Sequence, residues 1–179
     1  MPKATEIEPV QINMARNFAI EKHGNQRYGV HPYIFHLNQV AMILDNTYGN
    51  NSDTRVLMIT AGLLHDVVED TPVRISELKN LFGTGVADIV YAVTNELGRN
   101  RKEKLVKTMI KVRDFGAAAV AVKLADRIAN TEYSRSQRNN GGSHYEMYQK
   151  EYPFFRWYLY HKSDNLNDLW DRLDKATEQ

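Results

Sequence analysis

Apolar residues recur along most of the chain at the three- and four-residue spacing of amphipathic helices. Strand signals are weak, because no two alternating runs flank a two-residue turn of the Asn-Gly kind. The pattern predicts an all-α fold of roughly seven to nine helices. The clearest examples are Val10, Met14 and Phe18; Leu37, Val40, Ala41 and Leu44; Val86, Ile89, Val90 and Val93; and Leu166, Leu169, Trp170 and Leu173.

Glycine, proline and polar clusters predict where the helices end. Thr71 precedes Pro72 and is biased away from helical angles, so the helix containing His65 should end there. Ser163 or Asp164 is expected to cap the last helix. No internal repeat or linker is evident, so we expect one domain over residues 1–179, with the helices of 144–176 included. The expected breaks are Gly24–Pro32, Gly49–Ser52, Thr71–Pro72, Gly83–Gly85, Gly98–Asn100 and Ser134–Ser143.

Composition narrows the possible partners. Lys and Arg number 23 against 22 Asp and Glu, which gives a formal net charge of +1 and does not favour nucleic acid or anionic membranes. No apolar stretch is long enough to span a membrane, and the N-terminus does not resemble a signal peptide. We therefore expect a cytoplasmic protein with no nucleic-acid or membrane partner, while a homodimer stays open. The chain has no cysteine, so any metal must be held by His, Asp or Glu.

Charged residues occur where the pattern predicts burial. The run from Val56 to Val68 is apolar on almost every face of a helix, yet His65 and Asp66 lie inside it. A buried carboxylate costs several kcal/mol unless it is paired or bound to a metal. Two solutions remain open, a hydrogen bond between His and Asp on neighbouring helices or a divalent cation.

Two further residues complete a candidate metal set. Asp126 follows Ala117–Ala125, near the end of a helix that is otherwise small and apolar, and His36 stands at the start of the second predicted helix. With His65 and Asp66 they offer two imidazoles and two carboxylates, a set that suits Mn²⁺, Fe²⁺ or Zn²⁺.

Glu69 and Asp70 lie one helical turn beyond His65 and Asp66. Acids at a helix C-terminus oppose the helix dipole, which favours a functional reason over an ordinary acidic helix end. Under the functional interpretation they orient or deprotonate a metal-bound water.

These motifs together resemble the hydrolase domain of RelA/SpoT-type alarmone enzymes, within the HD superfamily. The likeness runs over about residues 11–135, and the H…HD…D signature falls on His36, His65-Asp66 and Asp126. The motifs that carry it are Gly24–His36, Leu63–Thr71, Phe82-Gly83, Val86-Ala87, Val93-Thr94 and Val122–Asn130.

The resemblance implies a function and roles for residues. It implies removal of the 3′-pyrophosphate from (p)ppGpp in the stringent response, with one Mn²⁺ on His36, His65, Asp66 and Asp126. It implies that Glu69 and Asp70 activate the water, that Arg27 stacks on the base and that Asn130 contacts the substrate. At 179 residues the chain looks like a stand-alone small alarmone hydrolase without a synthetase domain.

The chain departs from that family pattern at three positions. Tyr28 stands where the family usually has Lys, Leu37 where it has Pro, and Ala129 where His is common. Tyr28 removes a cation near the expected nucleotide, and it is itself a candidate contact to the substrate. The purine preference, (p)ppGpp with guanine or (p)ppApp with adenine, therefore stays open. The number of 5′-phosphates stays open as well.

Other residues have both a functional and an ordinary interpretation. Arg101 and Lys102 either fold over the pyrophosphate or begin a solvated helix. Lys123 either pairs with an acid or touches phosphate, and Tyr148 either closes the nucleoside side or packs with other aromatic residues. Arg135 and Arg138 form either a lid over the phosphates or an ordinary exposed loop.

Two other functions are compatible with the residues. One is an HD phosphomonoesterase acting on nucleotides or NADPH. The other is an inactive module that binds a nucleotide as a sensor.

Overall fold

The computed structural model describes residues 9–49, 52–137, 144–161 and 165–178. Nine helices of eight or more residues, plus the single turn α4, make up this part of the chain, which confirms the all-α prediction. The helices are α1 (Val10–His23), α2 (Ile34–Tyr48), α3 (Ser52–Leu64), α4 (Val67–Asp70), α5 (Ile75–Phe82), α6 (Thr84–Val93), α7 (Arg101–Phe115), α8 (Ala117–Ser136), α9 (Tyr145–Leu159) and α10 (Asn167–Thr177).

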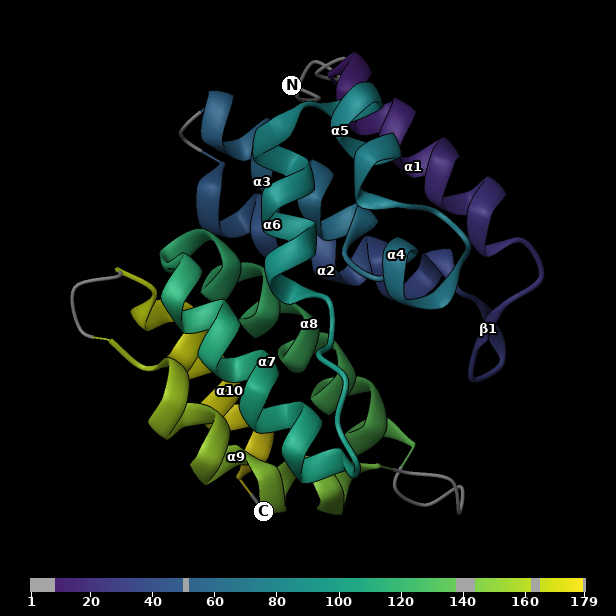
Figure 1. Ribbon diagram of the computed structural model, residues 1–179. Helices are drawn as coiled ribbons and strands as arrows, with labels where there is room; N and C mark the ends of the chain where they lie inside the picture. Colours follow the sequence, from purple (N-terminus) through teal and green to yellow (C-terminus); the bar gives the residue numbers. More distant parts are fainter. Residues whose placement is uncertain (1–8, 50–51, 138–143, 162–164, 179) are drawn as a thin grey trace, which may run out of the picture.

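Helix α8 occupies the centre of the fold. It packs against α2, α3 and α6 on one side and against α7, α9 and α10 on the other. Figure 1 shows this helix at the junction between the upper helices, among them α3 and α6, and the lower group of α7, α9 and α10. Small residues such as Ala119, Ala121 and Ala125 are completely buried, which permits close approach of so many neighbours.

The length of α8 corrects one expectation. Asp126 lies in the middle of this helix and not near its end, because the buried face continues through Ile128 and Ala129 to Thr131. The carboxylate of Asp126 is therefore held by helical turns on both sides. The sequence predicts the break at Ser134–Ser143, but α8 continues through Ser136. Arg138 lies outside the described residues.

The chain turns at His65 and Asp66, which corrects a second expectation. These residues do not lie inside one helix that runs to Thr71, because α3 ends at Leu64 and α4 begins at Val67. The His65 Nδ1–H donates to the carbonyl oxygen of Gly62 at 2.8 Å. In a continuing α-helix this carbonyl would instead accept from the backbone N–H of Asp66. Helix α4 ends at Asp70, and the extended backbone of Thr71 agrees with the expected break at Thr71–Pro72.

A two-residue hairpin was not predicted from the sequence. Strand β1 (Arg27–Tyr28) pairs antiparallel with β2 (His31–Pro32) through a turn at Gly29 and Val30. Gly29 has φ +57°, and a Cβ there would lie 2.0 Å from the hydroxyl oxygen of Tyr133. Glycine is therefore required both by the backbone angle and by the approach of α8.

Two apolar clusters form the core and share helices. Helices α2, α3 and α6 contribute to both, one cluster including α1 and α5 and the other α7 to α10. The predicted cap at Ser163 or Asp164 lies outside the described residues. Within the described parts of the chain, every helix is too short or too polar to cross a membrane.

Gly62→Ala is expected to lower the free energy of unfolding by about 1 kcal/mol. A Cβ at Gly62 would lie 2.6 Å from Cδ1 of the buried Leu44, where α2 and α3 pack closely. Overpacking costs about 1–3 kcal/mol and outweighs the gain of about 1 kcal/mol in helix propensity. Urea unfolding measures the difference.

Gly85→Ala is the matched control in a second helix. Its Cβ would meet only Cδ1 of Leu57, at 3.4 Å. The variant should be as stable as the wild type or more stable, by up to about 1 kcal/mol. Equal effects of the two substitutions would contradict the close approach of α2 and α3 at Gly62.

Candidate active site

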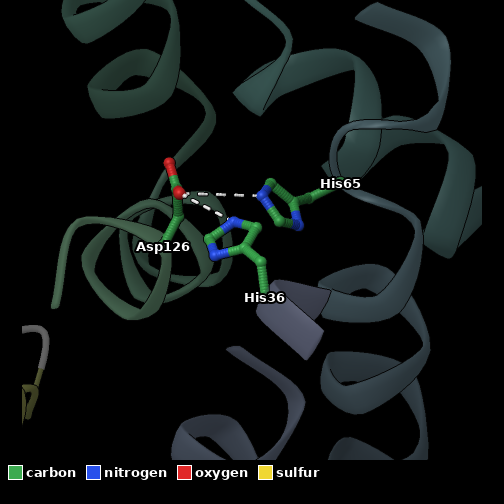
Figure 2. A group of neighbouring side chains, drawn as sticks. All are labelled: His36, His65 and Asp126. Atoms are coloured by element: carbon green, nitrogen blue, oxygen red, sulfur yellow. Dashed lines mark ion pairs between the residues drawn. The ribbon is translucent and has the colours of Figure 1, made fainter. Parts of the chain in front are cut away.

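Three side chains from distant segments converge at the junction of α2, the α3–α4 turn and α8. His36, His65 and Asp126 each offer one ligand atom, and these atoms all lie within 4.8 Å of one another. Figure 2 shows both imidazole rings directed at one carboxylate oxygen of Asp126. The Nε2 atoms of His36 and His65 lie 3.4 and 3.7 Å from that oxygen, Oδ1.

Asp66 adds a second carboxylate to the cluster. Its Oδ2 lies 3.0 Å from Nε2 of His65 and 3.7 Å from Nε2 of His36. The structure thus brings together all four residues that the sequence nominated as metal ligands. Both imidazoles are almost completely buried, and both carboxylates are largely buried.

The orientation of His65 suits metal binding. Because Nδ1 donates to a carbonyl oxygen, Nε2 of the neutral ring is a bare lone pair that faces the carboxylates. This buried Nε2 makes no hydrogen bond within the described residues. Histidine ligands of metals are commonly fixed in this way through the other ring nitrogen.

The charges of the cluster also call for a cation. Burial opposes ionisation of Asp126, but Lys123 and the two imidazoles outweigh it and hold the pKa of that carboxyl well below its usual range. Burial likewise opposes charging of His65, yet Asp66 and Asp126 raise the pKa of its imidazole. Two ionised carboxylates therefore attract positive charge, and the residues fit a divalent ion.

Neighbouring side chains hold both carboxylates in place. The Tyr33 hydroxyl donates to Asp66 Oδ2 at 2.6 Å. Lys123 Nζ lies 3.2 Å from Asp126 Oδ2, so Lys123 pairs with an acid, as one of its two interpretations predicts. The Asn130 amide donates to Asp126 Oδ1. Each carboxylate thus has a fixed orientation before any ligand arrives.

Glu69 and Asp70 point in different directions. Glu69 accepts hydrogen bonds from the backbone N–H of Asn95 at 3.2 Å and from its side-chain amide at 2.7 Å, and it lines the cleft. Asp70 accepts from Gln26 Nε2 at 2.8 Å and is not among the residues that line the cleft. The two predicted catalytic acids are therefore not equivalent.

The cluster forms the floor of a cleft of about 670 Å³. Its polar lining is rich in cations, which suits a polyphosphate. The residues that line the cleft include the candidate metal ligands His36, Asp66 and Asp126, together with Glu69 and Asn130. The lining cations are Arg99, Arg101, Lys104, Lys123 and Arg127.

A second hollow of about 560 Å³ adjoins the first and shares Asn130 and Tyr148 with it. It also contains Arg27, Tyr28 and Tyr133. Most of the residues predicted to contact the substrate therefore line one or both of these two hollows. Lys102 does not line either hollow, because its ammonium lies 5.4 Å from the ring centre of Phe154, in a third groove between α7 and α9.

One wall of the cleft depends on a carboxylate from α9. Glu151 accepts from Arg101 Nε at 2.6 Å and from Arg127 at 2.9 Å. The Arg127 guanidinium also lies over the ring of Tyr148, 4.8 Å from its centre. Glu151 therefore fixes two of the cations that line the cleft.

Sequence reasoning missed Tyr33, Asn95 and Glu151 as supporting residues. Tyr33 lies inside the Gly24–His36 motif, which was a usable signal, since polar residues next to a ligand often support it. Asn95 and Glu151 carry no local signal, because their partners lie 24 or more positions away along the chain.

Comparison with known proteins places this geometry in a family. An HD-domain family model matches residues 15–149. Because that match covers most of the chain, the protein belongs to the HD-domain family. The fold agrees, since a solved structure described as a metazoan SpoT ortholog that hydrolyzes ppGpp superimposes with a TM-score of 0.77 over 95% of each chain, at 24% identity.

Sequence relatives define the nearer group. The guanosine-3′,5′-bis(diphosphate) 3′-pyrophosphohydrolase MESH1 of Xenopus tropicalis is 36% identical over 146 residues, which cover 80% of this chain and 78% of that protein. The MESH1 protein of Danio rerio is 42% identical over 118 residues, or 64% of this chain and 63% of that protein. The resemblance to alarmone hydrolases is thereby confirmed.

Glu151→Gln is expected to destabilise the protein at pH 7 by about 1–2 kcal/mol, because it leaves the buried Arg127 without an ionised partner. The expected loss is smaller than for a fully buried ion pair, because Arg101, the other partner of Glu151, is partly exposed and solvent screens its charge. Urea unfolding at several pH values measures it. Asp114→Asn, which breaks an exposed pair with Arg113, should have little effect.

The loss should also depend on pH. Burial would raise the pKa of Glu151, but its bonds to Arg101 and Arg127 lower it from the ordinary value of 4.5. Its stabilisation is therefore present above that value and disappears as the pH falls through the lowered pKa. A difference between wild type and variant that grew on acidification would contradict this assignment.

Proposed function

We propose that the chain is a metal-dependent 3′-pyrophosphohydrolase of alarmone nucleotides, (p)ppGpp, (p)ppApp or both. It would release pyrophosphate and a purine 5′-di- or triphosphate. The observation that carries the proposal is the cluster of two imidazoles and two carboxylates at the floor of a cation-lined cleft. The names of the MESH1 relatives support the same reaction.

His36, His65, Asp66 and Asp126 would hold one divalent ion, which we propose to be Mn²⁺, with Fe²⁺ or Zn²⁺ as alternatives. When bound, such an ion supplies positive charge to phosphate oxygens and lowers the pKa of water. The remaining steps depend on side chains of the chain itself.

Glu69 is the better placed of the two predicted acids to accept a proton from water. It lies on the cleft wall, and Asn95 fixes both of its carboxylate oxygens. Water adds to the phosphorus that is attached to the 3′ oxygen. The bond between this phosphorus and the 3′ oxygen breaks, and the 3′ oxygen takes up a proton. Arg101, Lys104 and Arg127 would balance the charge of the departing pyrophosphate.

The distribution of charge gives the nucleotide a direction. Among the residues that the structure describes, five cations line the cleft above the proposed metal ligands, whereas Arg27 is the one Lys or Arg that lines the second hollow, among Tyr28, Tyr133 and Tyr148. We place the 3′-pyrophosphate in the cleft and the nucleoside in the aromatic hollow, where Arg27 and Tyr148 can contact the base.

The helices that build this site extend to α9, since Tyr148 and Glu151 come from it. This supports a single domain over residues 1–179. A cytoplasmic location, the lack of nucleic-acid or membrane partners, and a homodimer stay predictions.

Product analysis tests the function directly. The purified protein with Mn²⁺ is mixed separately with ppGpp, ppApp and NADPH. Pyrophosphate in equal amount to GDP or ADP is expected from at least one alarmone. Free orthophosphate as the main product would instead indicate a phosphomonoesterase, and tight alarmone binding without any product would indicate a sensor.

Glu69→Gln is expected to lower kcat by about 10²–10⁴-fold, because it removes a proton acceptor beside the scissile phosphate. Asp70→Asn should lower kcat less, since Asp70 is bonded to Gln26 outside the cleft lining. Steady-state kinetics with saturating Mn²⁺ measure both. Equal losses would mean that the acids act as one pair, and a normal kcat in Glu69→Gln would remove Glu69 from the chemistry.

Asp126→Ala is expected to lose both the bound ion and activity. Its Oδ1 faces both imidazoles, and its removal would leave Asp66 as the one carboxylate of the proposed ligand set. Equilibrium dialysis with Mn²⁺ measures the stoichiometry, and Glu69→Gln, which should retain its ion, is the control. An Asp126→Ala protein that kept its ion would exclude Asp126 from the ligand set.

A further inference from the structure

Tyr28 contacts the candidate metal ligand His36 directly and is linked to the candidate ligand Asp126 through Asn130. The two ligands come from different helices. Its ring stacks on the imidazole of His36, with ring centres 4.7 Å apart and planes 22° from parallel. Its hydroxyl lies 2.9 Å from the side-chain oxygen of Asn130 on α8. This half-buried residue therefore joins the hairpin to α2 and α8 beside the metal cluster.

The hydrogen bonds through Asn130 have only one consistent direction. An ionised carboxylate accepts and cannot donate, so the amide nitrogen of Asn130 must face Asp126. The amide oxygen then faces Tyr28, whose hydroxyl must donate to it. The oxygen of Asp126 that Asn130 contacts is Oδ1, the same atom that faces both imidazoles.

The hairpin holds Tyr28 in this position. Gly29 places the turn against the hydroxyl of Tyr133, and the rings of Tyr28 and Tyr133 lie 4.5 Å apart between centres. Tyr28 is thus enclosed by His36 and Tyr133. A lysine at this position has no ring to stack on His36 and would bring a positive charge towards a cation site.

We propose that Tyr28 is a positioning residue of the metal centre, which orients Asp126 through Asn130 and packs against His36. This assigns Tyr28 a different task from contact with the nucleotide, which the sequence suggested. The inference rests on the proposed function, because it requires that the cluster binds a divalent ion.

The test measures Mn²⁺ affinity by isothermal titration calorimetry, without any nucleotide. Tyr28→Phe removes only the hydroxyl and should weaken Mn²⁺ binding about 10-fold, at the lower end of the effect of such supporting groups. Tyr133→Phe is the matched control, because that hydroxyl lies at Gly29 and not at Asn130. It should bind Mn²⁺ within about 2-fold of wild type.

A double-mutant cycle asks whether the hydroxyl acts through Asn130. Asn130→Ala should weaken Mn²⁺ binding, and Tyr28→Phe should then add less than about 2-fold in that background, because residues in one hydrogen-bonded chain are not additive. Full additivity would overturn the proposed route. Metal-free thermal unfolding confirms that each variant is folded at the temperature of the titration.

Catalysis separates positioning from substrate contact. Saturating Mn²⁺ should return kcat and the nucleotide KM of Tyr28→Phe to within a few-fold of wild type. Normal Mn²⁺ affinity together with a raised nucleotide KM would overturn the inference and leave the proposed function intact. A wild-type protein that bound no divalent ion would overturn both.

Discussion

Two ionised carboxylates and two imidazoles share a small buried space where α2, the α3–α4 turn and α8 meet. A packed helical interior stabilises such a cluster only if a cation occupies it or if protons do. His65 presents the lone pair of its Nε2 to carboxylates that cannot donate to it, because its Nδ1–H is bound to Gly62. Gly62 therefore fixes the ring of His65 as well as packing against α2 in the core.

Helix positions and ligand types could be predicted from local pattern, because both leave a trace within a few residues. Apolar periodicity located the helices, and charges at His65, Asp66 and Asp126 conflicted with the burial of their neighbours. The turn at His65 could not be predicted from periodicity, since the apolar pattern continues through it to Val67 and Val68 and the break depends on a side-chain bond to Gly62. The contact of Tyr28 with Asn130 spans 102 positions and has no local trace.

A helix beyond the motifs that carry the resemblance to alarmone enzymes also shapes the cleft. Glu151 on α9 binds both Arg101 and Arg127, so the direction in which these guanidinium groups point depends on a helix beyond residue 135. A polyphosphate that enters the cleft must compete with Glu151 for them. The energy gained from each phosphate contact is reduced by the cost of breaking that pair, which favours substrates with enough charge to displace it.

The two hollows then differ in what they can select. The cleft selects for charge, since five cations among the described residues surround the site at which we propose a metal ion binds. Among the described residues, Arg27 is the one Lys or Arg that lines the aromatic hollow, and the hydroxyl of Tyr28 is bound to Asn130. Recognition of the nucleoside must therefore rest on stacking and shape more than on charge. Stacking discriminates weakly between purines, since every base offers a similar face, so guanine and adenine alarmones are expected to compete for the same site.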